Sequence, residues 1–200
     1  MNKLFFYILI FLTFSAKSEE IKEYTAKNIG TVLIKNIEND LLDPIILLNS
    51  NDKLKLSFDE FSDKLNNYTY TFIHCSANWE KSDLLPTEYL EGFTENYLNE
   101  YSFSFNTIHN YVHYECTFPN EDVSFILSGN YMLIVYNDET QKVILKKKFI
   151  VYEKIIQIEA NVKRATFLKD FISKQEIDFQ ISHTNFEIKN PREEIKVIIQ

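Results

Sequence analysis

Short runs in which apolar and polar residues alternate dominate this chain. Leu54, Leu56 and Phe58 alternate with polar neighbours, and the runs 68–75, 101–106 and 112–118 have the same period. A period of two is typical of half-buried β-strands, because successive side chains point to opposite faces. Polar pairs rich in asparagine and aspartate separate the runs, and the chain has only three glycines and four prolines. The pattern predicts an all-β sandwich.

Residues 128–153 predict the late strands of an immunoglobulin-like sandwich. Tyr131 to Tyr136 forms one strand, residues 137–140 reverse the chain, and Val143 to Val151 returns as its partner. A tyrosine at the start of such a strand resembles a tyrosine corner, whose hydroxyl bonds to upstream backbone. Antibody domains carry a cysteine two residues later, where this chain has Leu133. We therefore expect the sandwich without an antibody-type disulfide.

A new set of β patterns begins after residue 152. The segments 155–162, 176–183 and 193–200 indicate three further strands. Three or four strands cannot bury both faces of a sandwich. The expected organisation is a β-sandwich domain at residues 19–152 and, at residues 153–200, the beginning of a second β domain that is incomplete.

The first residues have the pattern of a secretory signal. Lys3 precedes an apolar run from Leu4 to Leu12, and Ala16 and Ser18 are the small residues that signal peptidase reads. The run is shorter than the roughly 20 residues of a membrane-spanning helix. We predict a signal peptide at residues 1–18 and no membrane span after its removal. The alternative is a retained membrane anchor.

Charge narrows the range of partners. Without Lys3 and Lys17 the chain has 19 basic and 29 acidic residues, a net charge of −10. This argues against nucleic acid or anionic lipid as the main partner, because clustered Lys and Arg bind phosphates. The basic cluster 146–148 is interpreted as a solvated strand edge. Apolar residues make up 45% of the chain, enough for a substantial core.

The stretch His74-Cys75-Ser76-Ala77-Asn78-Trp79 raises the question of catalysis. Neighbours on a strand point to opposite faces, so His74 cannot activate Cys75. A zinc site would need more ligands than His109 and His113, whose spacing of four suits a helix. We predict no catalytic residue, metal or cofactor. An enzymatic alternative remains, in which a distant histidine activates Cys75.

The only two cysteines, Cys75 and Cys116, allow one disulfide in an exported protein. The alternative is two buried free thiols. The loop after Cys75 is rich in large apolar residues, which either fold over the end of the sandwich or form a partner surface. Trp79, Tyr89 and Phe93 are the candidate partner contacts, and any helical turn is expected between Lys81 and Asn99.

Several segments occur in order at plausible spacing: the strand ending in His74-Cys75 with Trp79 after it, Ser82 to Leu84, the run 88–93, Phe103 to Thr107, Phe118-Pro119-Asn120, Ser128 to Tyr131 and residues 190–200. Together they resemble the plug protein of the type IX secretion system of Bacteroidetes. The segments, from about Tyr68 to Gln200, cover most of the mature chain. Family members continue for roughly as long again, so the resemblance implies that this chain lacks most of the second domain.

The resemblance also implies a function. It implies a periplasmic, non-enzymatic protein at the inner face of the outer membrane. Such a protein binds the periplasmic mouth of the translocon barrel and closes it when no substrate is passing. The alternative from the residues alone is an exported β-sandwich that binds carbohydrate or peptide on the aromatic side chains of residues 79–93.

Overall fold

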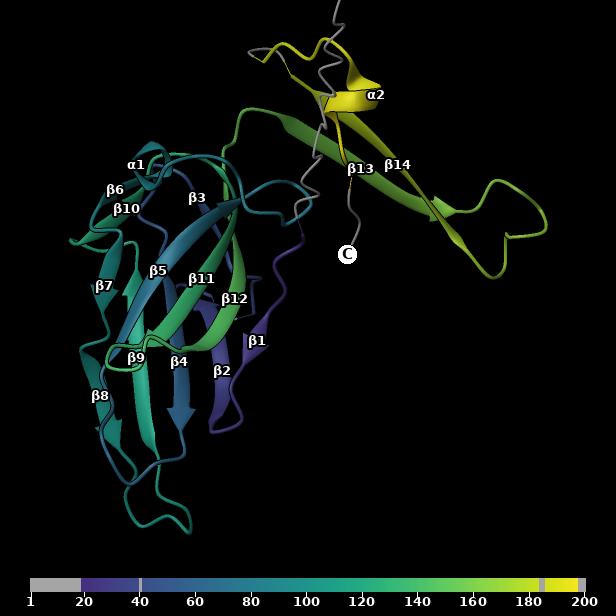
Figure 1. Ribbon diagram of the computed structural model, residues 1–200. Coiled ribbons are helices and arrows are strands. Elements are labelled where there is room, and N and C mark those ends of the chain that lie inside the picture. Colours follow the sequence, from purple (N-terminus) through teal and green to yellow (C-terminus); the bar gives the residue numbers. More distant parts are fainter. Residues whose placement is uncertain (1–18, 40, 184–185, 198–200) are drawn as a thin grey trace, which may run out of the picture. The chain divides into compact units, whose positions relative to one another are not determined.

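The structure is a computed structural model that describes residues 19–39, 41–183 and 186–197 (Figure 1). The predicted signal peptide, residues 1–18, lies outside the described residues. The chain divides into two compact units, one ending at Val151 and the other beginning at Tyr152. The first unit contains almost all of the buried side chains.

One sheet of the first unit has four antiparallel strands. Its order is β2 (Ile29–Asn36), β4 (Leu54–Glu60), β9 (Val112–Phe118) and β8 (Glu100–Phe103). In β4 and β9 every second side chain is buried. Their register places these buried positions opposite one another, as in the pair Leu56 and Cys116. The alternation seen in the sequence thus supplies one wall of the core.

The second sheet has six strands. Five follow the order β1 (Tyr24–Thr25), β12 (Val143–Tyr152), β11 (Gly129–Asn137), β5 (Tyr68–Cys75) and β7 (Glu95–Tyr97), and β3 (Ile45–Leu47) also pairs with β12. The central strand β11 is buried from Tyr131 to Val135 on both faces. The sequence of such a strand is a continuous run of apolar residues, because neither face of the strand contacts water.

The two sheets have the strand order of an immunoglobulin-like sandwich. Seven of the strands, taken in chain order, are β2, β4, β5, β8, β9, β11 and β12. The first, second, fifth and fourth of them (β2-β4-β9-β8) form one sheet. The seventh, sixth and third (β12-β11-β5) form the other, which is the constant-type arrangement. The predicted all-β, immunoglobulin-like fold class is confirmed.

Aromatic rings fill the space between the sheets. The ring of Phe72 lies 5.0 Å from Phe118, 5.0 Å from Phe125 and 5.6 Å from Phe149, measured between centroids. The last two pairs have the edge-to-face geometry that aromatic quadrupoles favour. Truncating a buried ring such as Phe72 to alanine would destabilise the fold by about 3–5 kcal/mol.

The tyrosine corner is present. The hydroxyl of Tyr131 donates to the carbonyl oxygen of Leu127, four residues upstream, at 2.6 Å. The ring of Tyr131 is fully buried and stacks on Phe149 with centroids 5.4 Å apart. The hydrogen bond therefore ties the start of β11 to the connection that precedes it.

Short elements cover one end of the sandwich. The helical turn α1 (Pro86–Tyr89) leads into β6 (Leu90–Gly92), which pairs with β10 (Val123–Phe125). The helical turn lies in the interval predicted for it. Gly92 has a φ of 98°, and an added Cβ would lie 2.2 Å from the carbonyl oxygen of Asp122. Glycine is required there because the two backbones approach too closely for a side chain.

The second unit is a β-hairpin and a helical turn. Strands β13 (Gln157–Arg164) and β14 (Gln175–Ser182) pair antiparallel, and α2 (Pro191–Glu194) follows. The predicted third strand, 193–200, is wrong over residues 193–197, which contain the end of α2 and no strand. Pro191 sets a helical φ at the first position, and Glu194 accepts from the backbone N–H of Asn190 at 3.1 Å.

Candidate functional site

His74 is part of the aromatic packing. Its ring lies 5.7 Å from that of Tyr89 and 5.2 Å from that of Tyr131. Its Nδ1 is 3.0 Å from the Ser82 hydroxyl and its Nε2 3.3 Å from the Ser128 carbonyl oxygen. An added Cβ on Gly129 would lie 2.3 Å from Nε2. Both ring nitrogens have partners, so His74 has a structural role.

Cys75 and Cys116 are both free thiols, and both are buried. Cys116 belongs to the core between the sheets, whereas Cys75 packs with Met132 and Ile134 in a separate cluster. In this structure the two thiols lie in different packing clusters and form no disulfide. Burial raises the pKa of Cys116 to about 12 and also raises the pKa of Cys75. Neither thiol has the lowered pKa of a nucleophile.

Trp79 lies in a tight turn, residues 76–80, that follows β5. The backbone N–H of Ser76 donates to Glu80 O at 2.8 Å, and that of Trp79 donates to Ser76 O at 2.9 Å. Trp79 has a φ of 64°, which is uncommon for a bulky residue. The turn directs the indole onto the cluster of Cys75, where it packs.

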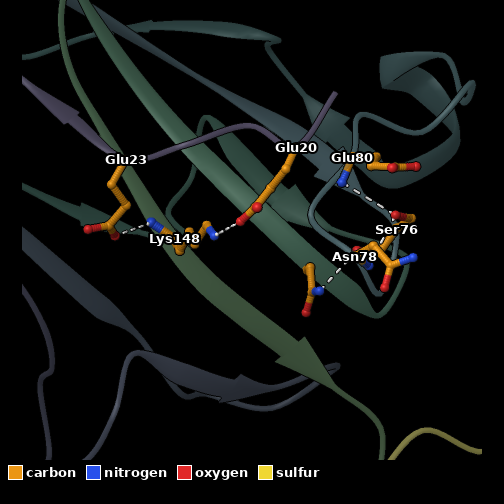
Figure 2. Close-up of polar contacts among 7 residues, drawn as sticks. Glu20, Glu23, Ser76, Asn78, Glu80 and Lys148 are labelled. Atoms are coloured by element: carbon orange, nitrogen blue, oxygen red, sulfur yellow. Dashed lines mark hydrogen bonds and ion pairs between the residues drawn. The ribbon is translucent and has the colours of Figure 1, made fainter. Parts of the chain in front are cut away.

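Lys148 of β12 covers the Trp79 ring. Figure 2 shows Lys148 in contact with Glu20 and Glu23 of the N-terminal segment. Its Nζ lies 4.6 Å from the ring centroid and 3.0 Å from Glu20 Oε1. Its backbone N–H donates to Glu23 Oε1 at 3.0 Å, and Ile21 N donates to Trp79 O at 2.9 Å. The hydrogen bond and charge of Lys148 lower the pKa of Glu20. Trp79 is therefore half-buried beneath a charged contact.

Tyr89 and Phe93, the other two candidate partner contacts, have opposite environments. Tyr89 is 4% exposed, and its hydroxyl donates to the Phe72 carbonyl oxygen at 3.2 Å. The side chain of Phe93 is 66% exposed. The tyrosine is thus part of the core, and Phe93 is the one of the three predicted contacts with an open ring.

The sequence reasoning missed a second exposed apolar region, at the opposite end of the sandwich. Phe105 and Ile108 lie in the loop between β8 and β9 and are 92% and 96% exposed. The predicted strand 101–106 ends at Phe103, so Phe105 lies beyond the last residue of β8. The signal that could have found this loop is its lack of charge, since residues 101–111 contain no Asp, Glu, Lys or Arg.

Several other titratable side chains form surface ion pairs. His113 Nδ1 lies 2.6 Å from Asp59 Oδ1, and Lys55 Nζ lies 2.6 Å from Glu115 Oε2. Within residues 19–39, 41–183 and 186–197, no three His, Cys, Asp or Glu side chains converge as a metal site requires. Among these same described residues, no helix has the length and apolarity needed to cross a membrane.

Comparison with solved structures finds a close structural relative. The chain is similar to a hypothetical protein from Parabacteroides merdae ATCC 43184, with a TM-score of 0.78 and 32% sequence identity over 84% of this chain. It spans 42% of the length of that protein. A Pseudomonas fluorescens alkylpurine DNA glycosylase bound to abasic-site DNA has a TM-score of 0.33 and 8% identity over 62% of this chain and 30% of that chain. That likeness is too low to support an argument.

Comparison of this chain with curated proteins finds no match. The family profile described as "Type 9 secretion system plug protein 1st domain" matches residues 29–153. The match begins with β2 and ends one residue after β12, so it spans all seven strands of the immunoglobulin-like order. The chain therefore belongs to the family of type IX secretion system plug proteins.

Proposed function

We propose that this protein is a non-enzymatic periplasmic plug. It binds the periplasmic mouth of the type IX translocon barrel in the outer membrane and closes it when no substrate is passing. The observation that carries the proposal is the family match over residues 29–153. The buried free thiols and the doubly partnered His74 are consistent with a protein that acts by binding.

The physical character of the first unit suits a plug. A body that blocks a pore must keep its shape while it occupies the opening, which favours a densely packed sandwich over a flexible module. The aromatic core provides this rigidity, because interlocked rings leave few alternative packings. Contacts of Glu20 and Glu23 with β12 also hold the N-terminal segment against the second sheet.

The alternative, a platform for carbohydrate or peptide, needs several rings exposed side by side. Tyr89 is buried in the core, and Lys148 covers the Trp79 ring. Of the three candidate aromatic residues, only Phe93 has an open face. The geometry of residues 79–93 therefore favours the plug.

The test is recovery of the tagged full-length protein from detergent-solubilised outer membranes. We expect the translocon barrel to be recovered with it. A known partner of the barrel, tagged and treated in the same way, is the positive control. If that partner brings the barrel down and this protein does not, the proposed function is wrong.

A further inference from the structure

The loop between β8 and β9 projects from the end of the sandwich (Figure 1). Its apolar side chains are exposed to solvent. We call residues 103–111 the hairpin tip. Phe105 and Ile108 are almost fully exposed, and Phe103 is exposed beside them. Contiguous exposed apolar groups on a folded domain mark sites of interaction, whereas single ones need no explanation.

Polar contacts fix the conformation of the hairpin tip. The backbone N–H of Ser104 donates to Tyr111 O at 2.9 Å, and the Tyr111 N–H donates to the Ser104 hydroxyl oxygen at 2.9 Å. The Thr107 hydroxyl donates to His109 O at 2.8 Å, and Asn110 Nδ2 donates to Asp63 Oδ1 at 2.8 Å. The loop is thus ordered without burying Phe105 or Ile108. Binding through these side chains would require little further ordering.

An open hollow of about 580 Å³ adjoins the hairpin tip. The β4–β5 connection contributes Phe61, Ser62 and Asp63, and the hairpin tip contributes Ile108, His109 and Asn110. Phe61 and Ile108 are the apolar side chains of this hollow, whereas Ser62, Asp63, His109 and Asn110 make the rest of its lining polar.

The charge distribution indicates the chemistry of the partner. No charged residue occurs from Tyr101 to Tyr111, although a quarter of the chain is charged and its net charge is −8. The hairpin tip itself therefore matches an uncharged partner surface, whereas the carboxylate of Asp63 lies in the adjoining hollow. Interfacial membrane segments commonly add Lys or Arg, which the hairpin tip lacks, and an acidic protein is repelled by anionic lipid. A protein partner is therefore favoured over a bilayer.

We infer that the hairpin tip contacts an uncharged apolar surface of the translocon barrel at its periplasmic mouth. This inference rests on the proposed function. It assigns the contact with the barrel to the end of the sandwich opposite to Trp79 and Phe93.

The experiment compares variants of the tagged full-length protein in the outer-membrane recovery assay. Phe105→Asp and Ile108→Asp place a charge in the hairpin tip, whereas Leu41→Asp places one at an equally open site (90% exposed) elsewhere in the first unit. We expect the tip variants to recover at least roughly tenfold less barrel than the unchanged protein. Substitutions at the centre of an interface commonly have effects of this size. Leu41→Asp and the conservative Phe105→Leu should recover the barrel as the unchanged protein does. Since all three side chains are in solvent, equal thermal unfolding of the variants should accompany this result.

Each contrary outcome has a distinct meaning. If the unchanged protein recovers no barrel, the proposed function fails and this inference with it. If the unchanged protein and the tip variants recover the barrel equally, the function stands and the assignment of the hairpin tip is overturned. Loss with Leu41→Asp as well overturns it in favour of a general charge effect. If only the tip variants lose binding to phosphatidylethanolamine vesicles, the hairpin tip binds a bilayer. If only the tip variants lose self-association, measured by light scattering, the hairpin tip binds a second copy of this protein.

Discussion

Replacement of Tyr131 by phenylalanine removes one hydroxyl from the tyrosine corner and leaves the buried ring in place. That hydroxyl donates to Leu127 O at 2.6 Å, with Tyr89 O as a second neighbour at 3.4 Å. The Tyr131 side chain and the bond to Tyr89 O are buried, and the bond to Leu127 O is partly buried. Loss of the donor leaves the Leu127 carbonyl without this bond, which costs about 1–3 kcal/mol of unfolding free energy.

Urea unfolding followed by tryptophan fluorescence measures this effect. Trp79 is the single tryptophan, and it packs against the second sheet, so its emission reports on the first unit. With a urea dependence of about 2 kcal/mol per molar, the unfolding midpoint should fall by roughly 0.5–1.5 M. Tyr101→Phe, which removes a hydroxyl from an exposed ring of the edge strand β8, is the matched control and should leave the midpoint unchanged. Equal midpoints for Tyr131→Phe and the unchanged protein would refute the stabilising role of the corner.

Three further predictions follow from burial. Burial raises the pKa of Tyr70 and of Tyr114 from 10.0 to about 12, so unfolding above pH 10 releases protons. Stability should therefore fall by about 1.4 kcal/mol per pH unit per tyrosine as pH rises toward 12, and a urea midpoint that stays constant over this range contradicts the sign. The Cys75→Ser variant should recover as much barrel as the unchanged protein does. Loss of barrel recovery by a variant whose unfolding midpoint is unchanged would support a chemical role for the thiol. Residues 155–200 should be removed by protease before the sandwich is cut, and truncation after Tyr152 should raise solubility, because a two-stranded hairpin leaves its apolar side chains exposed. Equal resistance of both units to protease would show that reasoning to be wrong.

The sequence predicted the sandwich best where burial alternates without interruption. In β4 and β9 the period of two is unbroken, and both strands were predicted. Strand β2 was missed, because Thr31 has a φ of 50° and the register with β4 shifts between Gly30 and Leu33. Such a bulge adds a residue and breaks the alternation on which the prediction depends.

The environment of each site residue depended on contacts that no local pattern contains. Tyr89 is buried because its hydroxyl reaches the carbonyl of Phe72, seventeen residues away. Phe105 continues the alternation of β8, yet the bonds between Ser104 and Tyr111 turn the chain before it can pair. The sequence identified these large apolar side chains in loops, and only the tertiary structure determines which of them are buried and which are exposed.

The most direct test of the plug is the ionic conductance of the purified translocon barrel in a planar bilayer. The account predicts that the full-length protein, added on the periplasmic side, lowers the conductance in proportion to the fraction of barrels bound, and that its removal restores it. Conductance that remains unchanged while the protein is bound to the barrel would contradict the account.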